Sequence, residues 1–165
     1  MFDDRSPLKA GSFPVTTIDW DHPTDPKPGT WQLDHVKQYV ANGAEGQYWN
    51  GTQTLLLTTI GRKSGDPVRT PLIYGEADGA YLIVASKGGD PAHPLWYRNL
   101  QEHPEVRIQV GPIILQGTAR TATAEERAAY WPLMVKHWPA YDEYQAKTDR
   151  EIPIVVIEPT TAPGD

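Results

Sequence analysis

The sequence predicts an α+β fold in which about six mostly antiparallel strands close into a barrel, with helices inserted between them. Apolar runs such as LLLTTI (55–60) and IPIVVI (152–157) have the length of strands, and glycine-bearing turns separate several of the runs. Successive hairpins favour antiparallel pairing, and closure into a barrel removes exposed strand edges. At 165 residues and 18.4 kDa, one domain is expected.

The chain divides into three parts by composition. Residues 1–29 are rich in proline and show no sustained apolar period, which predicts an irregular or mobile arm. Residues 30–159 carry the periodic segments and form the predicted domain, and residues 160–165 form a short tail. The domain opens with a helix over 31–42, because Leu33, Val36 and Val40 recur at helical spacing.

The remaining elements follow from apolar runs and turn signals. Strands are expected at 53–60, 68–76, 80–86, 105–110, 113–121 and 152–159. Further helices are expected at 93–103, at 124–138 and at 140–148. The second of these begins with a capping box, Thr123 and Glu126, and contains Pro132, which predicts a kink or break.

Charge and composition exclude several classes of function. A formal net charge of -6 argues against nucleic acid as the main partner. There is no cysteine, so no thiolate can act as nucleophile or metal ligand, and the five histidines lack the i, i+4 pairing of a helical metal site. Neither a secretory signal nor a run as long as a transmembrane helix is present, so a cytoplasmic protein is expected, with peripheral contact at the inner face of the membrane as an alternative.

Two glycine-containing loops carry the polar residues of interest. GRKSG (61–65) places Arg62 and Lys63 beside one turn, with Arg69 close behind. These cations suit a solvated turn, and they equally suit a site for a phosphate or carboxylate. SKGG (86–89) offers bare backbone and a lysine after a strand; it is either a plain connection to the next helix or a surface that a ligand can approach closely.

Five motifs in order resemble one family. GRKSG, R-T-P-L-x-Y, SKGG, HPxWYxNL and PAYDEYQAKTDRxIP, spread from about Trp31 to Pro159, are similar to the deazaflavin-dependent nitroreductase family. The resemblance implies a split β-barrel related to flavin reductases and the cofactor F420, a flat tricyclic ring joined to a phosphate and an oligoglutamate tail.

The resemblance also implies a role for each motif. The phosphate region of F420 would meet Arg62, Lys63 and Ser64, with Arg69 as a less direct candidate. Residues of the next two motifs would line the groove and meet the ring: Pro71, Leu72, Tyr74, Ser86, Lys87, Gly88 and Gly89. Trp96 and Asn99 would complete the cofactor wall.

The substrate is expected over the ring, beneath the helices of 124–148. Trp138, Tyr141 and Tyr144 match substrate-facing positions, and Tyr141, Tyr144, Ser86 or water would supply a proton. Trp138 replaces a tyrosine typical of members that reduce nitroimidazoles, which argues against that activity.

The expected function is hydride transfer from reduced F420 to a flat electron-poor acceptor, such as a quinone or nitroaromatic. FMN on the same barrel, or a non-catalytic protein that binds F420 or a lipophilic ligand, are the alternatives, and a monomer or weak dimer is expected.

Overall fold

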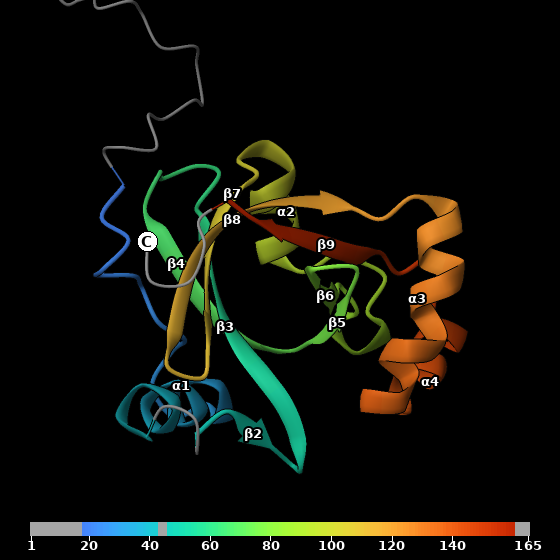
Figure 1. Cartoon of the computed structure of the whole chain (residues 1–165), viewed down its shortest axis with the longest axis horizontal. Helices are drawn as coiled ribbons and strands as arrows, with labels where there is room; N and C mark the ends of the chain where they lie inside the picture. The colour runs from blue at the N-terminus through green and yellow to red at the C-terminus, as the bar shows by residue number, and fades with distance from the viewer. Residues whose placement is uncertain (1–17, 43–45, 161–165) are drawn as a thin grey trace, which may run out of the picture.

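The computed structural model describes residues 18–42 and 46–160 (Figure 1). Residues 1–17 of the predicted arm and 161–165 of the predicted tail therefore lie outside the described part. Within it, an eight-stranded antiparallel sheet curls around a core, and four α-helices flank it. This confirms the α+β class and the mostly antiparallel barrel.

The strands follow one path in the order β2-β3-β7-β8-β9-β6-β5, and β4 pairs with the other edge of β3. Their bounds are β2 Tyr48–Trp49, β3 Thr52–Ile60, β4 Pro67–Ile73, β5 Gly75–Ala77, β6 Ala80–Val84, β7 Glu105–Val110, β8 Ile113–Thr121 and β9 Ile154–Pro159.

The predicted count of about six strands is too low for two reasons. The segment predicted as one strand over 68–76 is two strands, because β4 pairs with β3 whereas β5 pairs with β6. The chain changes partner at Tyr74, whose backbone N–H and C=O both bond to Gln53. The short strand β2 was missed, since two residues are too few to show a period.

The helices are α1 Trp31–Asn42, α2 Leu95–Glu102, α3 Ala124–His137 and α4 Ala140–Ala146. Pro94 is the N-cap of α2, so this helix begins two residues later than the predicted start at 93. The capping box of α3 is confirmed, because the Thr123 hydroxyl accepts from the Glu126 N–H and the Glu126 carboxylate accepts from the Thr123 N–H. The helix continues through Pro132, so the predicted break is wrong.

Each helix covers a different part of the sheet. Tyr97 and Leu100 of α2 enter the main core cluster inside the curled sheet. Met134 of α3 and Tyr141 of α4 belong to a second core cluster, against β6 and β9. Val36 and Tyr39 of α1 pack on Leu56. The 86–89 loop lies among α1, α2 and α4, and residues of all four line the cavities described below.

The described part of the arm is irregular and is held along the edge of β4. The Thr24 N–H donates to Pro67, and its C=O accepts from Arg69. The Asp25 carboxylate accepts two hydrogen bonds from the Arg69 guanidinium, at 2.7 and 2.8 Å. A segment with few apolar residues is thus ordered by backbone and ionic contacts.

Candidate functional site

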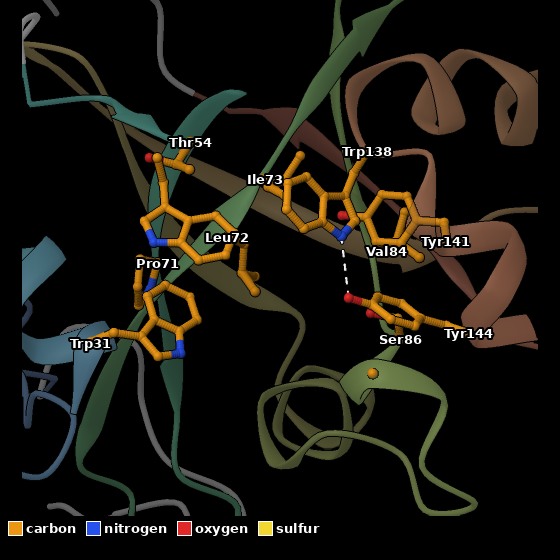
Figure 2. A pocket seen from close by; sticks show the side chains of 12 residues that line it. Trp31, Thr54, Pro71, Leu72, Ile73, Val84, Ser86, Trp138, Tyr141 and Tyr144 are labelled. Atoms are coloured by element: carbon orange, nitrogen blue, oxygen red, sulfur yellow. Dashed lines mark hydrogen bonds between the residues drawn. The ribbon is translucent and has the colours of Figure 1, made fainter. Parts of the chain in front are cut away.

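Three cavities that share lining residues form one groove. The tryptophan cavity, of about 180 Å³, is lined by residues of α1, β2, β3, β4, β6 and α4, of the 86–89 loop and of the turn between α3 and α4 (Figure 2). The central cavity, of about 360 Å³, shares Ser86 and Gly88 with it. The Arg69 cavity, of about 390 Å³, shares Lys87 and Trp96 with the central cavity. An elongated ligand can therefore contact all three.

Aromatic rings line the tryptophan cavity. The indoles of Trp31 and Trp49 stack at 4.5 Å between centroids, and Trp49 meets Trp138 at 5.3 Å. In Figure 2, Trp31 lies across the cavity from Tyr141 and Tyr144. Such rings favour flat ligands of partly apolar character.

One hydrogen bond crosses this aromatic wall. The Trp138 Nε1–H donates to the Tyr144 hydroxyl at 3.2 Å (Figure 2). Tyr141 is buried, and burial, with a smaller contribution from Tyr144, raises the pKa of Tyr141 well above its usual range. Tyr141 is therefore neutral at physiological pH and can only donate or accept as a phenol.

The 86–89 loop has a backbone suited to an anionic or polar ligand. Ser86 has right-handed helical angles, while Lys87, Gly88 and Gly89 have φ of 45, 63 and 86°. A right-handed residue followed by a left-handed one turns successive N–H groups, here those of Ser86, Lys87 and Gly88, toward one concavity that attracts negative charge. The Gly89 N–H instead donates to the Ser86 carbonyl oxygen at 2.9 Å. A Cβ on Gly88 would meet nothing within 4 Å, so this glycine leaves open space at the groove.

The Arg69 cavity contains cations, but Arg69 itself is already paired. Its guanidinium is bound by Asp25, which lines the same cavity. Lys27 and Lys87 also line it and are exposed. A polyanionic ligand here would therefore meet the lysines directly and Arg69 only in competition with Asp25.

The GRKSG loop lies beside the groove without lining any of the three cavities. The Arg62 N–H donates to the Asn99 amide oxygen at 3.1 Å, and the Asn99 amide nitrogen donates to Thr59 at 3.2 Å. The Ser64 hydroxyl accepts from the N–H of Asp66 within its own turn. Asn99, which lines the Arg69 cavity, thus connects this loop to the groove.

Two predicted cofactor residues are turned away from the groove. Tyr74 is 4% exposed in the main core, where burial and nearby acidic and phenolic groups raise its pKa to about 12. Gly89 is covered by α4, because a Cβ there would lie 2.6 Å from the Tyr144 carbonyl oxygen. Neither residue lines any of the three cavities.

Most other predicted residues do line the groove. These are Arg69, Pro71, Leu72, Ser86, Lys87, Gly88, Trp96, Asn99, Trp138, Tyr141 and Tyr144. Among the lining residues that the sequence reasoning missed are Trp31, Trp49, Ile73 and Val84 of the tryptophan cavity and Lys27 of the Arg69 cavity. Ile73 and Val84 lie at the ends of strands that precede the glycine motifs or the partner change, and that position was the available signal.

Comparisons with known proteins agree with this geometry. Residues 31–159 match the family model described as F420H(2)-dependent quinone reductase. An F420H2-dependent quinone reductase of Mycobacterium tuberculosis (strain ATCC 25618 / H37Rv) is 43% identical over an alignment of 133 residues, which covers 76% of this chain and 89% of that protein.

Two solved structures are similar in fold and sequence. A structure described as an F420-H2 dependent reductase (FDR-A) has a TM-score of 0.60 and 48% identity, covering 64% of this chain and 93% of that one. Another, described as a domain-swapped dimer, has a TM-score of 0.63 and 40% identity, covering 80% of this chain and 100% of that one. With the family model spanning the whole domain, these likenesses show that the chain belongs to the F420H2-dependent quinone reductase family.

Proposed function

We propose that this protein transfers hydride from reduced F420 to a quinone bound in the tryptophan cavity. The observation that carries the proposal is the continuity of the groove, since Ser86 and Gly88 line both the tryptophan cavity and the central cavity. A cofactor lying over the 86–89 loop would therefore be adjacent to an acceptor among the aromatic rings. Membership of an F420H2-dependent family makes F420 the cofactor.

The groove fits the shape and charge of F420. The left-handed backbone of residues 87–89 and the open space at Gly88 allow a flat ring to approach the backbone closely. The Arg69 cavity, with the exposed side chains of Lys27 and Lys87, suits an anionic tail. Arg62, Lys63 and Ser64 remain proposed partners of the phosphate region, at the border of the groove beyond Asn99.

The protein supplies position and charge stabilisation, and the cofactor supplies the chemistry. Bound in its reduced form, F420 is a donor of hydride from C5 of its ring. The backbone N–H groups of Ser86, Lys87 and Gly88 would stabilise negative charge on a ring held against them. Trp96 contributes apolar area between the central cavity and the Arg69 cavity.

The acceptor is held mainly by stacking. Trp31, Trp49 and Trp138 give the tryptophan cavity a wall of connected indoles, which favours a flat conjugated ring over a small polar substrate. Reduction of a quinone also needs protons. The Tyr144 hydroxyl accepts from Trp138, so its own hydrogen is available to the acceptor. Tyr141, Ser86 and water are the other proposed donors.

An equilibrium titration tests the cofactor. F420, FMN and NADPH are added in turn while tryptophan fluorescence is followed, because Trp31, Trp49, Trp96 and Trp138 line the groove. Saturable binding of F420 alone is expected. Saturable binding of FMN without binding of F420 would overturn the assignment.

Turnover then separates an enzyme from a carrier. Oxidation of reduced F420 is followed with a soluble naphthoquinone, with a nitroaromatic and without an acceptor. Quinone-dependent oxidation is expected to be the fastest. Tight F420 binding without oxidation by any acceptor would instead indicate a carrier.

A further inference from the structure

Arg150, between α4 and β9, fastens both ends of the 86–89 loop. Its Nη1 and Nη2 donate to the carbonyl oxygens of Ala85 at 3.1 Å and Ser86 at 2.7 Å. Its Nε donates to the carbonyl oxygen of Asp90 at 2.8 Å. One rigid guanidinium therefore joins the residues that enter the loop to the residue that leaves it.

The backbone between these contacts needs such a restraint. Lys87 has a positive φ of 45°, which residues other than glycine seldom adopt, and two glycines with positive φ follow it. Glycine is also the residue with the greatest freedom to leave such a conformation. Three charge-assisted hydrogen bonds oppose that loss of order.

The same guanidinium reaches the segment that begins α2. Arg150 Nη1 lies 3.1 Å from His93 Nδ1. Since a guanidinium can only donate, His93 Nδ1 is the acceptor and the imidazole carries its hydrogen on Nε2. His93 is followed by Pro94, which lines the central cavity and the Arg69 cavity. Arg150 thus orders two walls of the groove at once.

The underside of the loop is closed by α4 and the residue after it. Lys147 Nζ donates to the Gly88 carbonyl oxygen at 3.2 Å, and Gly89 packs against the backbone of Tyr144. The loop is therefore enclosed between the Arg150 contacts and the helix that carries Tyr141 and Tyr144. A shift of the loop would change its distance from both tyrosines.

We propose that Arg150 is a positioning residue that keeps residues 87–89 in their left-handed conformation and so pre-forms the surface for the cofactor ring. The part concerning the ring rests on the proposed function. The part concerning the loop rests only on the contacts of Arg150. Pre-formed sites bind more tightly because the ligand need not order them.

Arg150→Met tests the restraint, with Arg120→Met as the matched control. Arg120 also loses a bidentate set of bonds, at 2.7 and 2.8 Å to Glu126, and its side-chain bonds to described residues do not involve 85–90. The first measurement is hydrogen–deuterium exchange in the cofactor-free protein. Exchange at the amides of 87–90 is expected to rise about tenfold or more in Arg150→Met only, the scale of one lost charge-assisted bond.

The second measurement is F420 affinity by fluorescence titration. Arg150→Met is expected to weaken binding about tenfold to a hundredfold, and Arg120→Met to leave it unchanged. Arg150→Lys keeps the charge but cannot reach all three carbonyls with one ammonium, so it is expected to show the same defects. If Arg150→Met fails to fold, the exchange and affinity of Arg150→Lys decide the role of Arg150.

The outcomes separate the two ideas. Wild-type F420 affinity in Arg150→Lys together with unchanged exchange would overturn the positioning role and leave only a contribution of charge. Equal increases of hydrogen–deuterium exchange in Arg150→Met and Arg120→Met would also overturn the positioning role, because they would indicate general destabilisation. Failure of the wild-type protein to bind F420 would remove the proposed function, while the exchange data would still decide whether Arg150 orders the loop.

Discussion

The indole nitrogen of Trp138 donates a hydrogen bond to the hydroxyl of Tyr144, at 3.2 Å. An indole N–H has no acceptor capacity, so the Tyr144 oxygen is the acceptor and its own hydrogen is directed elsewhere. Both side chains line the tryptophan cavity. The Tyr144 hydrogen is therefore not used in this bond, and we expect it to be donated to whatever occupies that cavity.

Tyr144→Phe is expected to slow turnover without weakening the binding of F420. Deleting only the hydroxyl keeps the packing of the ring and removes one hydrogen bond or proton route. We expect kcat/KM for a soluble quinone to fall about tenfold to a hundredfold, with F420 affinity nearly intact. A fall in kcat indicates a proton donor, whereas a rise in KM indicates substrate positioning.

The matched control for Tyr144 is Tyr130→Phe. Tyr130 also makes one hydroxyl bond, to Asp78 at 2.7 Å, but lies outside the groove. Tyr130→Phe should therefore leave kcat and KM unchanged. Unaltered turnover in Tyr144→Phe would instead make Tyr144 a packing residue and leave Tyr141 and Ser86 as candidates.

Trp138→Phe is expected to act through Tyr144. Loss of one neutral hydrogen bond is worth about 0.5–1.5 kcal/mol, so kcat should fall about twofold to twelvefold if orientation of the phenol matters. In a Tyr144→Phe background the same substitution should have a much smaller effect on kcat. Steady-state kinetics of the four proteins form a double-mutant cycle, and strictly additive effects would show that the two side chains act independently.

Gly88→Val is expected to abolish tight F420 binding while the barrel stays folded. Gly88 and Gly79 both have positive φ and both have open space where a Cβ would be, so valine strains the two backbones similarly. Only Gly88 lines the groove. Thermal melts should therefore match for Gly88→Val and Gly79→Val, while fluorescence titration separates them. Normal F420 binding by Gly88→Val would place the ring elsewhere.

Lys63→Ala tests the phosphate role of the GRKSG loop. A charge-assisted bond is worth roughly 1.5–3 kcal/mol, so F420 affinity at low salt should fall about tenfold to a hundredfold, or less where Arg62 compensates. Folding should barely change, because the side chain is exposed. Lys136→Ala, an exposed lysine of α3, removes the same charge away from the groove. Equal losses in both variants would indicate only a general effect of net charge.

His93 is expected to make the protein less stable in acid. Burial, followed by the positive charges of Arg150 and Arg98, lowers the pKa of His93 below the usual 6.5. The folded protein thus prefers neutral His93, which accepts from Arg150 and lies 4.8 Å from the Tyr97 ring. The stability gained is fully present above the unfolded pKa of 6.5 and is lost as pH falls through the lower folded value.

Proton NMR of the imidazole gives the His93 pKa directly, and a value at or above 6.5 would contradict the lowered pKa. His93→Gln retains an oxygen that can accept from Arg150 but does not titrate in this range. Its free energy of unfolding should therefore decline less in mild acid than that of the wild type. His35, whose pKa is also lowered by burial, is common to both proteins and cancels in the comparison.

Local patterns in the sequence determined the elements and the candidate loops. Thr123 and Glu126 fixed the start of α3, because a capping box acts within one turn. Asp78 and Gly79 adopt the positive φ values, 54 and 79°, that their hairpin turn requires. The glycine-containing loops after β3 and β6 could also be identified from the sequence, because a turn that needs glycine is specified by residues that are adjacent in the chain.

Contacts between distant segments decided the rest. The family resemblance placed Tyr74 in the groove, but the structure buries it in the main core, at the point where the chain changes from pairing with β3 to pairing with β6. Trp49 entered the site because the curled sheet brings β2 beside α1 and beside Trp138, in the turn between α3 and α4. Arg150 joined residues more than fifty positions away. Such contacts depend on how the sheet curls and how helices pack on it, and neither is encoded within a short stretch of sequence.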